Sequence, residues 1–432
     1  MIVRRWPARP ECLSKNLDTK NPGQHDMMND SSQPVGTAVG GLVRKVRSAR
    51  LLAASLASLA LCAPHASAQD IGVLDDRIVF GQAAALEGSA AALGLGMQLG
   101  IRAAFEEANR AGGVHGRTLE LVSENDGYEP SRSIEVVRKL INQNQVFALI
   151  GAVGTPTASA TQPIAMEAGV PFVGAFTGAG FLRNAELGNV VNIRASYDAE
   201  TERWMQTLVD EQRKKRIAIL YQDDAFGRAG LSGAQAALER RGMDFVVKGT
   251  YQRNTTAVKA ALLEIRKADP DAVVMVGAYK PIAEFIKVAR SIEFEPSFVN
   301  ISFVGSDALS SELGEDGENV IISQVVPFPW DETNPLVTAY RAALAEVDAE
   351  ATPGFVSFEG YITGRLAAMA LAEAGPDVTR QSFLETIWTT GTFEMDGLTL
   401  QFGPDDNQGL DAVFMTEIEP DGTFRPMNEP QS

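Results

Sequence analysis

The feature that most constrains this chain is a regular alternation of short β-type runs with amphipathic helical stretches, which starts at Arg77. Ile78–Ala84 is typical of a strand and Met97–Ala111 of a helix, and this pairing repeats along the sequence. The rhythm restarts at the short strand Val190–Ile193, and this second series includes the strongly apolar strand Arg216–Gln222. Strands that alternate strictly with helices form parallel sheets covered on both faces. We therefore predict an α/β fold made of two similar lobes with parallel-type sheets.

The later part of the chain does not form a third series. Helices are predicted over Leu336–Val347, Phe355–Ala374 and Gln381–Thr389, and strands over Leu398–Phe402 and Ala412–Glu419. No linker rich in Pro, Gly and Ser separates these segments from the rest. We predict that the helices return to the first lobe (69–193 and 327–396) and the strands to the second (194–326 and 397–432).

Residues 43–68 have the pattern of a secretory signal peptide. A basic stretch precedes the apolar run Leu51–Pro64, and a small-residue cleavage site ends at Ala68. We predict cleavage after Ala68 and export of the mature chain to the periplasm. A buried apolar helix is one alternative, and a lipoprotein anchored at Cys62 is another. We interpret residues 1–42 as an extension from a misassigned start.

Composition excludes several classes of partner and chemistry. Without the first 68 residues the chain keeps 29 of its 38 basic and 51 of its 55 acidic residues, a net charge of −22. Nucleic acids and anionic membranes would repel such a surface, so neither is an expected partner.

Both cysteines, Cys12 and Cys62, precede the predicted cut, and His115 is the one histidine that follows it. We therefore expect no disulfide, no metal site and no His-based triad. No phosphate-binding glycine motif occurs either, so we expect no nucleotide cofactor and no enzymatic activity.

Candidate ligand-binding residues follow the predicted strands, because ligands bind beyond the carboxyl ends of strands in open α/β sheets. Thr155, Thr157 and Ser159 open a helix, where hydroxyls and free N–H groups suit a carboxylate. The residues that follow other strands are Phe176, Thr177, Gly178, Asp224, Tyr279 and Asp307. One lobe thus offers hydroxyls and amides and the other offers aromatics and carboxylates, which suits an amino acid. The alternative interpretation is that these residues only cap helices.

The order of several segments resembles the leucine/isoleucine/valine-binding family of periplasmic proteins that serve ABC importers. The resemblance runs from Ile78 to Glu419 and rests on Phe80–Gly94, Gly112–Leu121, Asp126 with Pro130, Gly151–Pro163, Val170–Val173, Arg194–Tyr197 and Tyr221–Gly227. It implies a type I periplasmic binding fold, in which two Rossmann-like lobes are joined by three hinge strands and close on a ligand.

The resemblance also implies roles for individual residues. Thr157-Ala158-Ser159 would hold a ligand carboxylate, and Phe176-Thr177-Gly178 would contribute from the next strand. Tyr197 and Tyr279 would contact the ligand, and Asp307 would receive an ammonium group.

Three residues depart from the family pattern and bear on the ligand. Ala158 stands near a ligand-facing serine of the amino-acid binders, Leu93 stands near a tyrosine, and Asp307 is shorter than the usual glutamate. The expected ligand is a small amino acid, a related carboxylate or amide, or an aromatic acid.

We expect a monomeric substrate-binding protein that delivers this ligand to the permease of an ABC importer. The alternative is a periplasmic sensor that signals to a membrane or regulatory partner. The scarcity of histidine and cysteine disfavours a third interpretation, a secreted hydrolase.

Overall fold

A computed structural model describes residues 70–427, which all belong to one compact unit, Ser67–Ser432. The predicted extension 1–42, the signal peptide 43–68 with its cleavage after Ala68, and both cysteines lie outside the described residues. Among the helices within 70–427, none is long and apolar enough to cross a membrane.

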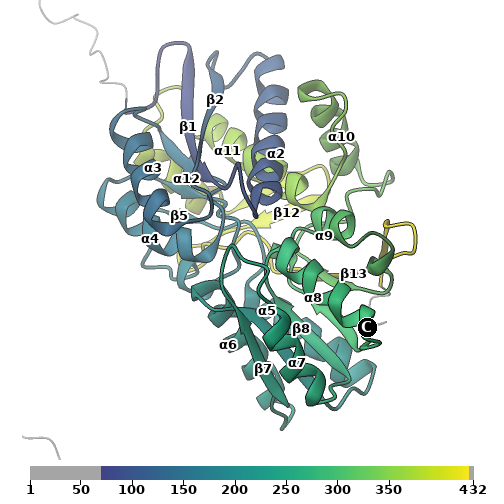
Figure 1. Cartoon of the computed structure of the whole chain (residues 1–432). Coiled ribbons are helices and arrows are strands. Elements are labelled where there is room, and N and C mark those ends of the chain that lie inside the picture. The colour runs from purple at the N-terminus through teal and green to yellow at the C-terminus, as the bar shows by residue number, and fades with distance from the viewer. Residues whose placement is uncertain (1–69, 428–432) are drawn as a thin grey trace, which may run out of the picture. The chain divides into compact units, whose positions relative to one another are not determined.

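The first half of the structure is built on a fully parallel sheet with the strand order β2-β1-β3-β4-β5. Its strands are β1 (Arg77–Ala84), β2 (Thr118–Asn125), β3 (Ala148–Ile150), β4 (Phe172–Val173) and β5 (Val190–Val191). In β1, Val79 and Ala83 belong to one buried cluster whereas Ile78 and Phe80 belong to another, as the alternation of side chains along a strand requires. The helices α3 (Pro130–Asn142) and α4 (Thr155–Glu167) cover the first face, and α2 (Ala91–Arg110) covers the second (Figure 1).

The second half repeats this strand order. Its parallel strands run β7-β6-β8-β9-β10, and the antiparallel strands β13 and β14 extend the sheet beyond β10. The strands are β6 (Ile217–Gln222), β7 (Val247–Tyr251), β8 (Ala272–Val276), β9 (Ser297–Asn300), β10 (Ile321–Gln324), β13 (Phe414–Ile418) and β14 (Phe424–Pro426). The helices between them are α5 (Tyr197–Met205), α6 (Ala225–Glu239), α7 (Lys259–Lys267), α8 (Tyr279–Ser291) and α9 (Ser306–Leu313). The predicted α/β fold with two similar, mainly parallel sheets is confirmed.

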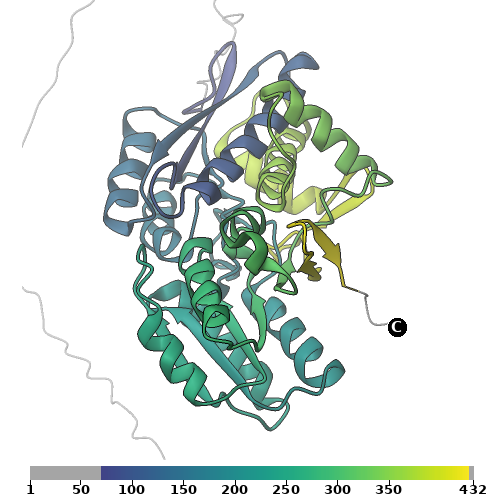
Figure 2. The same cartoon turned by 45° about the vertical axis from the view of Figure 1, so that its right-hand side comes forward.

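The late helices pack on the first half. They are α10 (Pro335–Val347), α11 (Phe355–Ala374) and α12 (Arg380–Thr390), and α10 and α11 lie against α2 (Figure 2). A Cβ atom on Gly100 of α2 would lie 1.8 Å from the Ser357 carbonyl oxygen of α11, so glycine is required for this close approach. Helix α2 begins at Ala91 rather than at the predicted Met97. Gly94 and Gly96 in these first turns weaken the local helix signal, and close packing of Gly94 on Ala85 and of Gly96 on Val356 compensates.

The late strands divide between two sheets. As predicted for the later strand, β13 joins the second sheet beside β10. The prediction for Leu398–Phe402 was wrong, because β12 (Leu398–Gln401) pairs with β11 (Thr392–Met395) in a separate two-stranded ribbon. The turn between them explains the difference. Asp396 and Gly397 both have positive φ, 48° and 97°, which is the favoured geometry of a tight hairpin.

Local contacts set two further element ends. Ser196 caps α5, because its hydroxyl accepts a hydrogen bond from the Ala199 N–H at 3.1 Å. The strand β9 ends at Asn300, and a 3₁₀ turn, Ser302–Val304, follows it. Short helical segments also occur at Gly180–Leu182, Gln206–Glu211 (a π-helix) and Gly314–Gly317.

Three chain segments cross between the halves, at 192–196, 325–334 and 402–413. The first and third lie side by side, since the Asn192 N–H donates to the Asn407 carbonyl at 2.7 Å and the Gly409 N–H donates to the Asn192 carbonyl at 2.9 Å. Such paired crossings restrict how the two halves can move relative to one another.

Candidate functional site between the two sheets

Each sheet has a point where its strand order reverses, between β1 and β3 in the first half and between β6 and β8 in the second. Ligands bind beyond the carboxyl ends of strands at such points. The two edges meet in this structure. The Gln222 side-chain amide donates to the Tyr128 hydroxyl at 3.2 Å, and the Ala92 N–H lies 3.5 Å from the Tyr279 hydroxyl. The candidate site is therefore the region where the two edges face each other.

Three threonines lie at the edge of the first sheet. The hydroxyls of Thr155 and Thr177 are 2.7 Å apart, and both residues are buried. The Thr157 hydroxyl faces the carbonyl oxygens of Gly154, at 2.9 Å, and of Val153. No side chain caps the first turn of α4, whose N-cap is Gly154. Hydroxyls beside the N–H groups of a helix start can receive a carboxylate.

Five aromatic side chains meet between the sheets. The Phe303 ring lies 5.2 Å from Phe176, 5.9 Å from Tyr128 and 4.5 Å from Phe226, centroid to centroid, and Tyr197 lies 5.6 Å from Phe226. None of the five is more than 1% exposed. Because Tyr128 and Phe176 belong to the first half and Phe226 and Phe303 to the second, the hydrophobic core continues from one half into the other.

A buried ion pair lies beside these rings. The guanidinium carbon of Arg194 lies 4.5 Å from the centroid of the Phe176 ring, and its Nε is 3.0 Å from Oε1 of Glu359. Its Nη2 donates to the Ser302 hydroxyl at 2.8 Å, and Glu200 accepts hydrogen bonds from the N–H and hydroxyl of Ser302. Burial raises the pKa of Glu359 to about 7, with Arg194 opposing the rise and Glu200 adding to it. Arg194 thus links a crossing segment to both halves.

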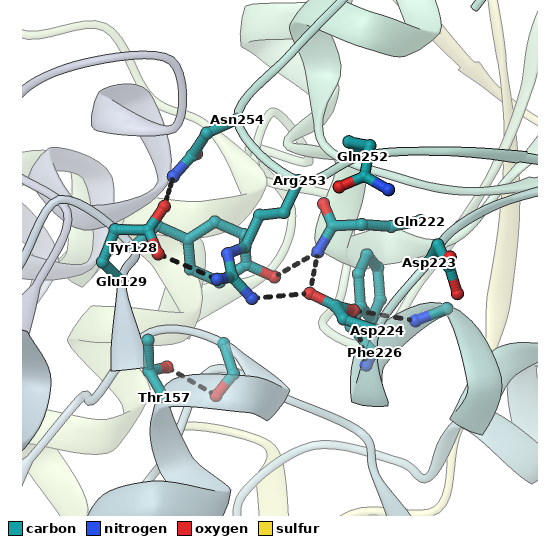
Figure 3. A network of polar contacts seen from close by, with 12 residues as sticks. Tyr128, Glu129, Thr157, Gln222, Asp223, Asp224, Phe226, Gln252, Arg253 and Asn254 are labelled. Carbon is teal, nitrogen blue, oxygen red and sulfur yellow. Dashed lines mark hydrogen bonds and ion pairs between the residues drawn. The ribbon is translucent and has the colours of Figure 1, made fainter. Parts of the chain in front are cut away.

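A second polar network joins the halves at the surface (Figure 3). Nη1 of Arg253, a residue that follows β7, contacts Asp224 of its own half at 3.0 Å, and its Nη2 contacts Glu129 of the first half at 2.8 Å. Asn254 donates to Glu129 at 2.6 Å. We call Glu129, Arg253 and Asn254 the interlobe contact. Asp224 is fully engaged, because it also accepts from the N–H of Phe226, at 2.9 Å, as the N-cap of α6.

Other predicted residues lie around this region in different environments. Ala158 is buried in the cluster between α4 and the sheet, whereas Ser159 is exposed on the same helix. Gly178 lies against Tyr197, since a Cβ there would be 2.5 Å from the Cδ1 atom of Tyr197. The buried Tyr197 hydroxyl forms no hydrogen bond of normal geometry. Burial raises its pKa, with Arg194 and the neighbouring Thr177 opposing the rise.

Tyr279 and Asp307 occupy different parts of the second edge. Tyr279 is buried with its hydroxyl near Ala92 of the first half. The Asp307 carboxylate accepts a hydrogen bond from the Phe355 N–H at 3.2 Å, so it caps the start of α11 across the interface. Burial raises the pKa of Asp307 to about 6. No ion pair to Asp307 is found within residues 70–427.

Among the interface residues that sequence reasoning missed, four lie at the carboxyl ends of strands. Tyr128 follows β2, Gln222 ends β6, Arg253 follows β7 and Phe303 follows β9. All four satisfy the criterion used for the predicted site, a position at the carboxyl end of a strand. In the Asp126-Gly127-Tyr128 turn, Tyr128 has a φ of 60°, a conformation that is uncommon outside glycine and that the sequence pattern does not predict.

The described residues contain no group of three or more His, Cys, Asp and Glu side chains arranged to hold a metal ion. The polar groups that the two edges provide are hydroxyls, amides and charged pairs, which can bind and orient a small molecule.

The two sheets share one strand order among their parallel strands, face each other through their carboxyl edges and are joined by three crossing segments. This arrangement defines the class of two-lobed α/β binding proteins. The chain belongs to the periplasmic binding protein family, whose sequence profile matches residues 77–423. The predicted resemblance to the leucine/isoleucine/valine-binding proteins of type I fold is thereby confirmed.

Individual relatives agree with this assignment. A possible leucine/isoleucine/valine-binding protein from Rhodopirellula baltica is 37% identical, with a TM-score of 0.78 over 84% of this chain and 98% of that one. Leu/Ile/Val-binding protein homolog 7 of Brucella abortus is 26% identical over 283 residues, 63% of this chain and 67% of the relative. A branched-chain amino acid transporter substrate binding protein from Streptococcus pneumoniae, solved with isoleucine, shares the fold at 19% identity and a TM-score of 0.71, over 81% of this chain and 98% of that one.

Proposed function

We propose that this protein is the periplasmic component of an ABC importer, which captures a small ligand between its two halves and presents it to a permease. The observation that carries the proposal is the meeting of the two reversal points, because each edge contributes polar groups to the region where the edges face each other. The proposed protein is an exported monomer, cleaved after Ala68, that binds its ligand without turnover.

We propose a ligand with a carboxylate or amide group, such as a small amino acid. Thr155, Thr157 and Thr177 supply hydroxyls next to the open start of α4, which is a suitable environment for a carboxylate. Relatives that are 26% and 37% identical are named for leucine, isoleucine and valine, which all carry this group. The five buried rings would exclude water from the apolar part of the ligand.

An ammonium group would need an acidic partner on the second edge. Asp224 is engaged by Arg253 and by the start of α6. Among residues 70–427 Asp307 forms no ion pair, and it accepts a hydrogen bond from the Phe355 N–H of the other half, so it remains the proposed ammonium partner. Its raised pKa of about 6 would fall when a cation approaches, because an opposite charge favours the ionised form.

We also propose that the halves open to admit the ligand and close around it. The contacts Gln222–Tyr128 and Glu129–Arg253 each join a residue of the first half to a residue of the second half that lies far away in the sequence. Such contacts would stabilise the closed arrangement once a ligand bridges the two edges.

A thermal-shift screen of the mature protein with amino acids, amides and aromatic acids tests the function directly. A ligand present at a hundred times its dissociation constant stabilises a protein by about 2.7 kcal/mol, which a melting curve resolves. Calorimetry then gives the affinity, and X-ray scattering shows whether the radius of gyration falls on binding. A protein that no compound of these classes stabilises would contradict the proposal.

Substitutions locate the site. Thr177→Val removes one hydroxyl from the edge, and we expect about a ten- to hundredfold loss of affinity, since a hydrogen bond to a charged group contributes about 1.5–3 kcal/mol. Ser159→Ala is the matched control because it removes an exposed hydroxyl from the neighbouring helix. Equal effects of the two changes would place the ligand elsewhere.

A further inference from the structure

A large pocket lies on the outer side of the interface, beside the second crossing segment. Its volume is about 820 Å³, within the range of pockets that bind small molecules. It is formed by α9 and the turn after it, by the crossing segment at Phe328 and Trp330, by the loop before α11 and by the β13–β14 hairpin at Phe424. Asp307 is the one residue of the predicted cleft that lines it.

One wall of this outer pocket is aromatic. The Trp330 ring stacks on Phe424 with centroids 5.5 Å apart and an interplanar angle of 18°, and Phe328 meets Trp330 edge-on at 5.1 Å. Phe355 supports them from behind, 5.4 Å from Trp330. The three lining rings are only partly buried, so they present aromatic surface to the pocket.

The rest of the lining is acidic. Asp307, Glu315 and Asp421 line the pocket, and none of the lining residues is Lys, Arg or His. Hydrogen bonds from the side chain and N–H of Thr423 lower the pKa of Asp421, so this carboxylate is ionised at neutral pH. An anionic ligand would be repelled by these groups, and a neutral apolar ligand would cover carboxylates without compensating their charge.

Aromatic faces combined with carboxylates are the environment that organic ammonium ions favour, because the rings attract the cation through their quadrupoles and the carboxylates neutralise it. We propose that the outer pocket is a binding site for an organic cation with an apolar body, such as a substituted or quaternary amine. This site goes beyond the transport function proposed above: it shares Asp307 with the proposed cleft, but its lining includes none of the threonines of the cleft.

The position of the pocket gives the bound cation a second effect. Asp307 belongs to the second half, whereas Thr352 and Pro353 precede α11, which packs on the first half. A ligand that contacts both sides would bind the closed arrangement more tightly than the open one and would shift the equilibrium towards closure.

Choline tests the proposal, with 3,3-dimethylbutan-1-ol as its uncharged analogue of the same shape. We expect choline to bind the mature protein in titrations followed by NMR and by tryptophan fluorescence, and the alcohol to bind at least tenfold more weakly. Trp330→Leu and Glu315→Gln should each weaken choline binding by fivefold or more. Glu315 is exposed, so its substitution tests the site even if the tryptophan variant fails to fold.

The cleft variant Thr177→Val should leave choline affinity unchanged, and Trp330→Leu should leave the affinity for a ligand of the cleft within twofold. These two controls separate a failure of the outer pocket from a failure of the transport proposal. Equal binding of choline and its neutral analogue, no binding of either, or choline binding that neither Trp330→Leu nor Glu315→Gln weakens would overturn the inference.

Discussion

Replacing Glu129 by glutamine should weaken ligand binding without touching the ligand. Glu129 pairs with Arg253 at 2.8 Å and accepts from Asn254 at 2.6 Å, and both partners belong to the other half. The side chains of Arg253 and Glu129 are 21% and 40% exposed, so solvent screens the pair. An ion pair of this exposure contributes about 0.2–1 kcal/mol. With the Asn254 hydrogen bond, the closed arrangement should lose about 1–2 kcal/mol in total.

This loss should appear as reduced affinity for the ligand. The contact exists only when the halves are together, so the substitution makes closure less favourable. A ligand that requires closure then binds less tightly. A change of 1–2 kcal/mol corresponds to a factor of about 5–30 in the dissociation constant. Most of it should appear in the dissociation rate, as is usual for affinity differences between closely related complexes. Calorimetry and stopped-flow dissociation with the ligand found by the screen measure both quantities.

Glu124→Gln is the matched control. Glu124 pairs with Lys139 at 2.6 Å at similar exposure, but both residues belong to the first half. We expect no change in affinity from this substitution. The reasoning is refuted if Glu129→Gln leaves the affinity within twofold of the original, or if Glu124→Gln weakens binding equally. A double-mutant cycle with Arg253→Gln should return a coupling energy of the size of the ion pair.

Three further outcomes concern stability. Arg194→Met leaves the buried carboxyls of Glu359 and Glu200 without their cation. Chemical denaturation should show that the free energy of unfolding falls by about 3–5 kcal/mol at pH 8. The loss should be smaller at pH 5, where Glu359 is protonated. The pKa values of Glu359 and Asp307 rise from 4.5 to about 7 and from 3.8 to about 6 on folding, so the native state holds protons that the unfolded chain has released. Their contribution therefore falls as pH rises from about 4 to 7. A free energy of unfolding that rises over this range relative to that of the Glu359→Gln variant would contradict this reasoning. Gly154→Ala should destabilise the protein by more than the 1–3 kcal/mol of a strained backbone alone, because its φ is 103° and a Cβ would lie 2.2 Å from a tyrosine ring. Gly169→Ala, at a φ of 61° in open space, should show only the backbone part of this loss in the same denaturation assay.

Much of the architecture was predictable because its signals are local. The alternation of strands and helices predicted two similar parallel sheets, and the rule that ligands bind at strand ends selected Thr155, Thr177 and Phe176, which the structure brings together. The Asp-Gly turn between β11 and β12 was an equally local signal for a hairpin, and its neglect led to the wrong sheet for β12.

The meeting of the two halves was decided by the tertiary structure alone. Glu129 and Arg253 lie 124 residues apart, and Arg194 and Glu359 lie 165 apart. Hydrophobic periodicity and turn propensity reflect interactions within a few residues, so they place each of these side chains at a strand end or on a helix but cannot select its partner. That choice depends on how two complete sheets with their helices pack together. The same packing sets Asp307 of the second half against the start of α11 and leaves the acidic, aromatic pocket beside it. The sequence near Asp307 does not predict this, because the position of α11 depends on its contact with α2 in the first half.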